Sequence, residues 1–80
     1  MLLSCRLEVT FSGFPYPDVT WYREGLEIQP SADFRITTLN NKSFLLIPEV
    51  FVEDAGVFTV RAANKFGMVE CKATLDVAGA

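Results

Sequence analysis

The stretch from Glu53 to Asn64 constrains the fold most strongly, because it joins a tight turn to a strand of alternating side chains. Asp54 can accept hydrogen bonds from backbone N–H groups of the turn, and Gly56 can adopt backbone angles closed to other residues. The even positions after the turn all suit a buried face: Phe58, Val60 and Ala62. Alternation of this kind is typical of a strand with one face in the core. The turn therefore determines where the strand begins and which of its residues point inward.

Five further segments have apolar patterns that predict strands. They are residues 4–12, 19–23, 34–36, 44–47 and 69–77. The inward positions expected in them include Cys5, Leu7, Val9, Phe11, Val19, Trp21, Phe34, Ile36, Leu45, Ile47, Val69, Cys71, Ala73, Leu75 and Val77. Residues 26–33 are less regular and predict a crossing segment. The last strand is the longest and has the cleanest alternation.

Turn residues separate these segments. Two prolines predict a loop after the first strand, and an Asn pair predicts a tight hairpin, since Asn tolerates left-handed backbone angles. The turn signals are Pro15 and Pro17, Glu24-Gly25, Asn40-Asn41, and Asn64 to Gly67. Counted with the irregular segment 26–33, there are seven short extended segments, and they show neither helical periodicity nor an internal repeat, so they predict an all-β sandwich. The pattern alone does not separate an immunoglobulin-like sandwich from a fibronectin-type one.

Size and charge limit the classes of partner. Eighty residues make one domain at most, and 50% of them are apolar, which is ample for a core. The net charge of -3 comes without a basic run, so we expect no nucleic-acid partner and no anionic membrane surface as partner. No stretch approaches the roughly 20 apolar residues of a membrane span.

The chain lacks the residues that most catalytic and metal sites need. It contains no histidine and only two cysteines, Cys5 and Cys71, so neither zinc ligation nor a histidine-activated nucleophile can be assembled from it. The carboxylates occur singly or side by side, as in Glu53-Asp54, where a turn role explains them better. We therefore expect no catalytic, cofactor-binding or metal-binding residue, and no enzyme activity in this domain.

One spacing pattern covers almost the whole chain. Its positions are Gly13, Pro15, Pro17, Val19, Trp21, Leu45, Ile47, Asp54, Gly56, Phe58, Val60, Ala62, Asn64, Gly67, Leu75 and Val77. The pattern resembles the I-set immunoglobulin domain, and the sequence as a whole is most similar to such domains in giant sarcomeric muscle proteins. The resemblance implies two antiparallel sheets with Greek-key connections. It also makes Trp21 the core tryptophan of strand C, and Asp54 and Gly56 the corner between strands E and F.

Three positions depart from the family pattern. Val9 and Val60 stand where the family usually has the two cysteines that join the sheets, and Phe58 stands where it usually has a tyrosine. A disulfide closing the 51 residues from position 9 to position 60 would contribute about 4 kcal/mol in the chain-entropy model. We expect the two valines to touch in the core instead. The missing disulfide favours a reducing compartment.

The start of the chain also departs from the family. Counted back from Val9, residues 1–4 fall where the turn into strand B belongs, so the resemblance implies that strands A and A′ are missing. We therefore interpret residues 1–80 as a single I-set domain truncated at its N-terminus. Strands B and G would then have open edges, which invite strand addition from another chain. Truncation, splicing and dimerisation through strand G all remain open at this point.

Two groups of residues carry separate expectations. Cys5 and Cys71 are expected on inward faces as buried thiols without a disulfide between them, and a redox role for either stays open. Four aromatic residues in loops or turns either cover the ends of the sandwich or contact neighbouring domains or a ligand protein. They are Phe14, Tyr16, Phe51 and Phe66.

The resemblance implies a function without chemistry of its own. It predicts a structural and protein–protein interaction module of a multidomain sarcomeric or cytoskeletal protein, acting as spacer, elastic link or docking domain in the cytoplasm. The implied partners are neighbouring immunoglobulin domains and sarcomeric proteins. The alternative is an extracellular immunoglobulin domain of an adhesion molecule or receptor. The sequon Asn41-Lys42-Ser43 matters only for that alternative, and the missing core cysteines argue against it.

Overall fold

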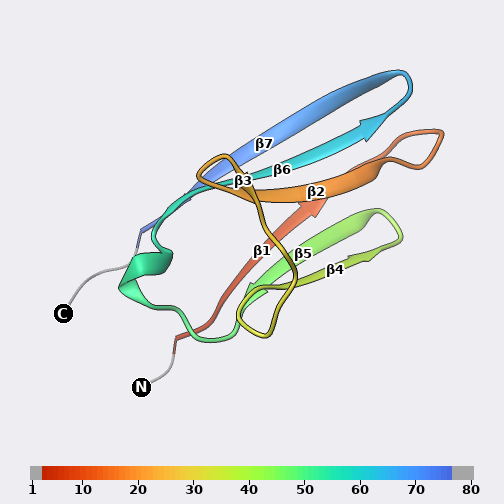
Figure 1. Ribbon diagram of the computed structural model, residues 1–80. Coiled ribbons are helices and arrows are strands. Elements are labelled where there is room, and N and C mark those ends of the chain that lie inside the picture. The colour runs from red at the N-terminus through yellow and green to blue at the C-terminus, as the bar shows by residue number, and fades with distance from the viewer. Residues whose placement is uncertain (1–2, 77–80) are drawn as a thin grey trace.

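A computed structural model describes residues 3–76, which form two antiparallel β-sheets packed face to face (Figure 1). The elements are β1 (Cys5–Thr10), β2 (Asp18–Arg23), β3 (Leu26–Glu27), β4 (Arg35–Leu39), β5 (Lys42–Ile47), the 3-10 helix η1 (Val52–Asp54), β6 (Gly56–Asn64) and β7 (Gly67–Leu75). The seven strands and the two-sheet arrangement confirm the predicted β-sandwich.

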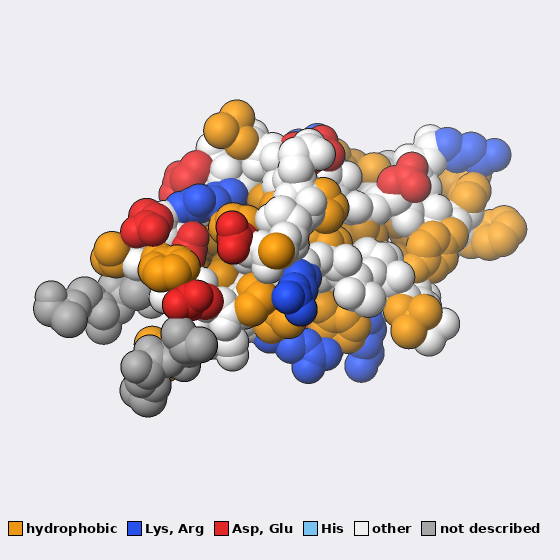
Figure 2. Space-filling model, turned by 60° about the horizontal axis from the view of Figure 1, so that its bottom comes forward, with side chains coloured by type: hydrophobic (Ala, Val, Ile, Leu, Met, Phe, Trp, Pro, Cys, Tyr) orange, Lys and Arg blue, Asp and Glu red, His pale blue; other side chains and the backbone are white. Residues whose placement is uncertain are grey.

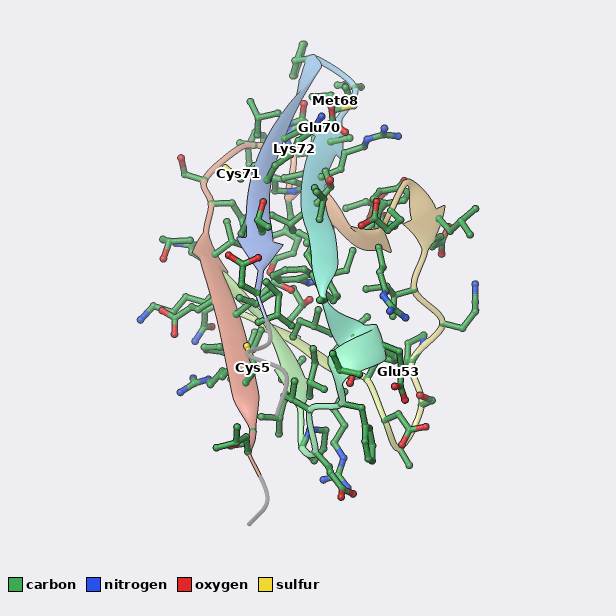
Figure 3. The ribbon with its side chains drawn as sticks, turned by 90° about the vertical axis from the view of Figure 1, so that its left-hand side faces the viewer. Cys5, Glu53, Met68, Glu70, Cys71 and Lys72 are labelled. Carbon is green, nitrogen blue, oxygen red and sulfur yellow. The ribbon has the colours of Figure 1, made fainter. Side chains whose placement is uncertain are left out.

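The chain crosses between the two sheets three times, after β1, after β3 and after β5. One sheet has the order β1-β5-β4 and the other has the order β3-β2-β6-β7. The strand edges β1 and β7 lie on the same side of the sandwich (Figures 1 and 3). Among residues 3–76, no strand pairs with the outer edge of β1 or of β7, where the family topology has strands A and A′.

The predicted turns are all present. Glu24 and Gly25 have positive φ angles of 49° and 82° in the turn between β2 and β3, and Asn40 has a φ of 55° in the turn between β4 and β5. Asn64 pairs with Gly67 across the turn between β6 and β7. Gly25 and Asn40 are residue types that tolerate left-handed backbone angles, and the three tight turns set the registers of the strand pairs that they connect.

Six buried side chains from both sheets form the core: Trp21, Ile28, Leu45, Ile47, Phe58 and Val60. The Trp21 indole N–H on β2 donates a hydrogen bond of 2.8 Å to the Ser43 hydroxyl on β5. Ser43 is fully buried, and its hydroxyl also lies 2.9 Å from that of Thr38 on β4. A buried polar contact therefore joins the sheets. Ile28, from the irregular segment, is the core member that the alternation did not predict.

The corner before β6 is built as the sequence predicts. The Asp54 carboxylate accepts a hydrogen bond of 2.8 Å from the Phe51 backbone N–H. Gly56 has a φ of 148°, and a Cβ at this position would collide with the Glu24 carboxylate. That carboxylate accepts a hydrogen bond of 2.9 Å from the Val57 N–H, so it locks the corner to the β2–β3 turn.

The residues that depart from the family pattern lie in the core. Phe58 is 1% exposed, and Val60 is buried in the core cluster. Val9 is half-buried and packs against the same cluster from β1. Val9 and Val60 thus both contribute to the apolar packing between the sheets, and a direct contact between the two valines stays a prediction. Cys5 and Cys71 are both free thiols.

The expectation that Cys71 is buried is wrong. Cys71 pairs with Val60 in the sheet and lies on its inner face, but its side chain is exposed. The neighbouring inner positions Val69 and Ala73 are exposed too, and only Leu75 is half-buried. The alternation was read correctly, yet no strand in residues 3–76 covers the far side of β7. Val77 lies outside the described residues. Cys5 is partly buried.

The missing inter-sheet disulfide leads to a first prediction. The double variant Val9→Cys/Val60→Cys should form a disulfide under oxidising conditions and gain about 4 kcal/mol in the free energy of unfolding, since the bridge closes a long loop. Urea denaturation followed by circular dichroism measures this gain.

The double variant and its control both carry Cys5→Ser and Cys71→Ser, because Cys71 lines the same pocket as Val9 and Val60 and could compete for the new thiols. The single variant Val9→Cys in this background is the control and should show no gain on oxidation. Reductant should return the double variant to the stability of its reduced form and leave the wild-type chain unchanged. A wild-type stability that falls on reduction would contradict this account of the core.

Candidate protein-docking edge

Within residues 3–76, the outer edge of β7 has backbone groups that pair with no other strand. Asn64 and Gly67 flank a two-residue turn, so they form a hydrogen-bonded pair, and such pairs then alternate along β6 and β7. The Glu24 N–H donates a hydrogen bond of 2.9 Å to the Val57 carbonyl, so the Val57 backbone groups face β2 and not β7. This agrees with the alternation derived from the turn. It follows that four residues of β7 direct their N–H and C=O groups away from β6: Met68, Glu70, Lys72 and Thr74.

The side chains of β7 divide into two rows. Met68, Glu70 and Lys72 lie on one face, while Cys71 belongs to the opposite, inward row (Figure 3). The inward row consists of Gly67, Val69, Cys71, Ala73 and Leu75, so it contains no charge. The strand also contains no proline. Inward charges and prolines are devices by which edge strands are protected, and β7 lacks both.

A groove runs between β7 and β1 beneath this edge. It consists of two adjoining pockets of about 280 and 270 Å³, and a third pocket of about 330 Å³ continues it between β7 and the loop after β1. Val9 and Thr10 form one wall, Val69 and Cys71 form the other, and Val60 lies at the base. We call this depression the β1–β7 groove. Its lining is mostly apolar, so an extended segment with small apolar side chains would suit it.

The two charged side chains of β7 differ in whether they already have an ion-pair partner. The Glu70 carboxylate lies 3.1 Å from the Arg61 guanidinium of the adjacent strand. Arg61 also stacks over the Tyr22 ring, 4.9 Å from its centroid. Lys72, two residues further along β7, has no ion-pair partner within 4.0 Å among residues 3–76. The edge therefore carries one cation that is free to pair with an incoming carboxylate.

The four aromatic residues singled out from the sequence do not form one site. All are exposed: Phe14, Tyr16, Phe51 and Phe66. Phe14, Tyr16 and Phe66 lie in the loops at the end of the sandwich opposite the termini, where hydrophobic side chains gather (Figure 2). Tyr16 packs edge-on against Phe11 at 5.6 Å and donates a hydrogen bond to the Asn40 carbonyl. Phe51 precedes η1 at the other end.

Sequence reasoning did not single out Glu70 and Lys72 on the β7 edge. A usable signal was present, because the two-residue turn after Asn64 determines which backbone groups of β7 face outward. Asn41 of the sequon is exposed in the β4–β5 turn, whereas Ser43 is buried under Trp21. The structure thus gives Ser43 a packing role independent of the sequon.

Residues 3–76 contain neither a candidate metal centre nor a membrane-spanning helix. Within this part of the chain, no group of three or more Cys, Asp or Glu side chains is placed to hold a metal ion. The same residues contain no helix that is long and apolar enough to cross a membrane.

Comparisons with known proteins agree with the geometry. The family model of the immunoglobulin I-set domain matches residues 3–77. Titin of Drosophila melanogaster is 49% identical over 72 residues, or 90% of this chain, and myopalladin of Mus musculus is 44% identical over 87 aligned positions spanning 99% of it. The chain covers 6% of the length of myopalladin and, to the nearest per cent, 0% of that of titin.

Solved structures give the same result. The titin domains Z1Z2 in complex with telethonin match with a TM-score of 0.94 at 40% identity, over 99% of this chain and 40% of that chain. The titin M4 domain matches with a TM-score of 0.92 at 27% identity, over 96% of this chain and 80% of that chain.

The alternation along β7 of backbone groups that bond to β6 and groups that face outward leads to a second prediction. In the monomer, the amide protons of Glu70, Lys72 and Thr74 should exchange with solvent much faster than those of Cys71 and Ala73, because only the latter bond to β6. Hydrogen exchange followed residue by residue by NMR measures the contrast. Equal protection of neighbouring amides would show that the outer edge is covered.

Proposed function

The chain belongs to the immunoglobulin I-set family, and on that basis we propose that it acts as a structural and protein–protein interaction module of a multidomain sarcomeric or cytoskeletal protein. In this role it serves as spacer, elastic link or docking domain. We propose that residues 1–80 belong to a single I-set domain; among residues 3–76, no strand pairs with the outer edge of β1 or of β7. The domain itself performs no catalysis.

The open β7 edge carries the docking part of this proposal. Its outward backbone groups offer hydrogen bonds to an extended segment, and the β1–β7 groove offers apolar contact beside them. In β-strand addition the main chain supplies most of the affinity, while side-chain pockets supply specificity. Partners are therefore expected to be proteins that contribute an exposed strand.

The exposed loop end also supports the docking part of the proposal. Phe14 is 89% exposed and Phe66 is 76% exposed, and hydrophobic side chains gather at this end (Figure 2), as they do on surfaces that bind other proteins. Both ends of the described chain lie at the opposite end of the sandwich (Figure 1), so a protein or domain that docks on these loops would cover the two rings. The unit itself is elongated, since it spans 45 × 21 × 18 Å, and such a shape suits a spacer.

The relatives support the cellular setting. Titin and myopalladin are muscle proteins of the sarcomere and cytoskeleton, and solved titin domains of the same fold are complexed with telethonin. The valines in place of the inter-sheet disulfide fit a reducing cytoplasm. We place this chain in the cytoplasm at the sarcomere, with other immunoglobulin domains and sarcomeric proteins as partners.

A second candidate is an extracellular adhesion or receptor domain. The observation in its favour is that Asn41, the acceptor of the sequon, is exposed in a turn. Against it stand the missing disulfide and the packing role of Ser43, which explains the sequon without a glycan.

Localisation tests the docking function. A fluorescently tagged chain should give a regular striated pattern in striated muscle cells. The variant Thr74→Pro removes one outward N–H and leaves the β6–β7 hydrogen bonds in place, so it should reduce the striated signal several-fold.

Thr74→Val is the matched control, since it keeps the N–H and nearly the same shape, and it should localise like the wild-type chain. Both variants should have melting temperatures close to that of the wild type. Diffuse signal from the wild-type chain would contradict the sarcomeric assignment, and full localisation of Thr74→Pro would exclude docking at β7.

The compartment can be tested on the natural protein. Enzymatic removal of N-glycans should leave its mass unchanged, because a cytoplasmic protein does not meet the glycosylation machinery. A mass shift that disappears in the variant Asn41→Gln would favour the extracellular candidate.

A further inference from the structure

We propose that two copies of the chain associate through β7, pairing antiparallel across a two-fold axis that passes beside Cys71. This inference rests on the docking edge of the proposed function and names its occupant as a second copy. The two four-stranded sheets then join into one continuous sheet.

β7 is the best suited of the four edge strands. β3 has two residues and β4 has five, whereas β7 has nine. β1 has six residues, and its charges are already engaged: Arg6 lies 3.6 Å from Glu8 and 4.2 Å from the Phe44 centroid, and Lys42 lies 3.9 Å from Glu8. The long β7 edge retains the unengaged Lys72.

Charge determines the register between the two copies. Glu70 and Lys72 have opposite charges, lie two residues apart, and both direct their backbone groups outward. Pairing centred on Cys71 places Glu70 of each copy opposite Lys72 of the other, so two cross-strand ion pairs form in hydrogen-bonded positions.

Neighbouring registers lack this complementarity. Centring on Glu70 puts two glutamates directly opposite each other, and centring on Lys72 does the same with two lysines, which destabilises pairing. Centring on Val69 or Ala73 places Glu70 opposite Met68, or Lys72 opposite Thr74, without any ion pair. The Cys71 register is the one that pairs both charges.

In the same register, the inward side chains of the two β7 strands also match each other in size and polarity. A two-fold axis perpendicular to the sheet keeps the inward rows of both copies on one side. Val69 of each copy then stands opposite Ala73 of the other, with the two Cys71 residues opposite each other between them. These exposed apolar side chains extend the wall of each β1–β7 groove. The dimer thus covers apolar surface that the monomer leaves open.

The ion pairs would extend a network that already exists. Glu70 is held 3.1 Å from Arg61, so its carboxylate is positioned before the second copy arrives. Lys72 of the second copy would approach the same carboxylate from the open side. Each Glu70 then lies between two cations, one from each copy.

A charge-reversal experiment tests the register. Lys72→Glu places two glutamates opposite each other at both pairs, and Glu70→Lys does the same with lysines. Each variant alone should raise the dimer dissociation constant about tenfold or more, since two attractive pairs become repulsive. An equimolar mixture of the two variants should dimerise again, because both pairs are then of opposite charge. Sedimentation equilibrium of the 80-residue chain over a concentration series measures these constants.

Matched controls carry the same charge changes on other edges. Arg35→Glu on β4 and Glu27→Lys on β3 should leave the dissociation constant unchanged. A wild-type chain that stays monomeric at the highest attainable concentration would overturn the proposal. So would single variants that dimerise like the wild type, or a mixture that fails to recover while circular dichroism shows both variants folded.

Crosslinking tests the position of the axis. Residues at non-hydrogen-bonded antiparallel positions have Cα atoms about 4.5 Å apart, which is within the range of a disulfide. In a Cys5→Ser background, diamide should join two copies through Cys71. Each thiol loses its proton, the sulfurs form a bond, and the N=N group of diamide takes up two electrons and two protons.

A mixed-cysteine experiment separates this register from random collision. In the Cys5→Ser/Cys71→Ser background, Val69→Cys mixed with Ala73→Cys should crosslink to heterodimers much faster than either variant alone to homodimers. Equal rates would overturn the Cys71 register. If the wild-type chain is monomeric yet striated in muscle cells and sensitive to Thr74→Pro, the self-association fails while the proposed docking function stands.

Discussion

The buried Trp21 and its hydrogen bond to Ser43 are the contact on which the rest of the structure depends. The indole fills the space between the sheets, and its N–H is satisfied by a hydroxyl from the opposite sheet. An unsatisfied buried donor costs about 1 to 3 kcal/mol, so this pairing restricts how β2 and β5 can be placed. In a sandwich without an inter-sheet disulfide, it is the polar link between the layers beside the apolar packing.

Strand β6 connects this core contact to the docking edge, because it packs against Trp21 and pairs with β7. Its inner residues Phe58 and Val60 pack against Trp21, and the corner at Gly56 sets where the strand starts. The two-residue turn after Asn64 then sets the register of β7. The outward direction of the Glu70 and Lys72 backbone groups is therefore a consequence of core packing and turn chemistry.

Much of the fold could be predicted from local patterns. Alternation identified the inner residues of β1, β2, β5 and β6, and turn residues located the hairpins at Glu24-Gly25 and Asn40-Asn41. The alternation did not identify Ile28 as a core residue, because Ile28 lies in an irregular segment. Its side chain is buried because this segment passes over the core. It is held there by a hydrogen bond of 2.9 Å from its N–H to the Trp21 carbonyl.

The sequence by itself determined which residues lie in strands, which face inward and where the turns occur, because these depend on side-chain period and backbone preference. Only the tertiary structure decided whether an inward face is covered. Val60 and Cys71 are cross-strand neighbours on the same inner face, yet one is buried and the other exposed. The reason is that cover for β7 must come from another strand at its edge, and pairing between distant segments leaves no trace in local alternation.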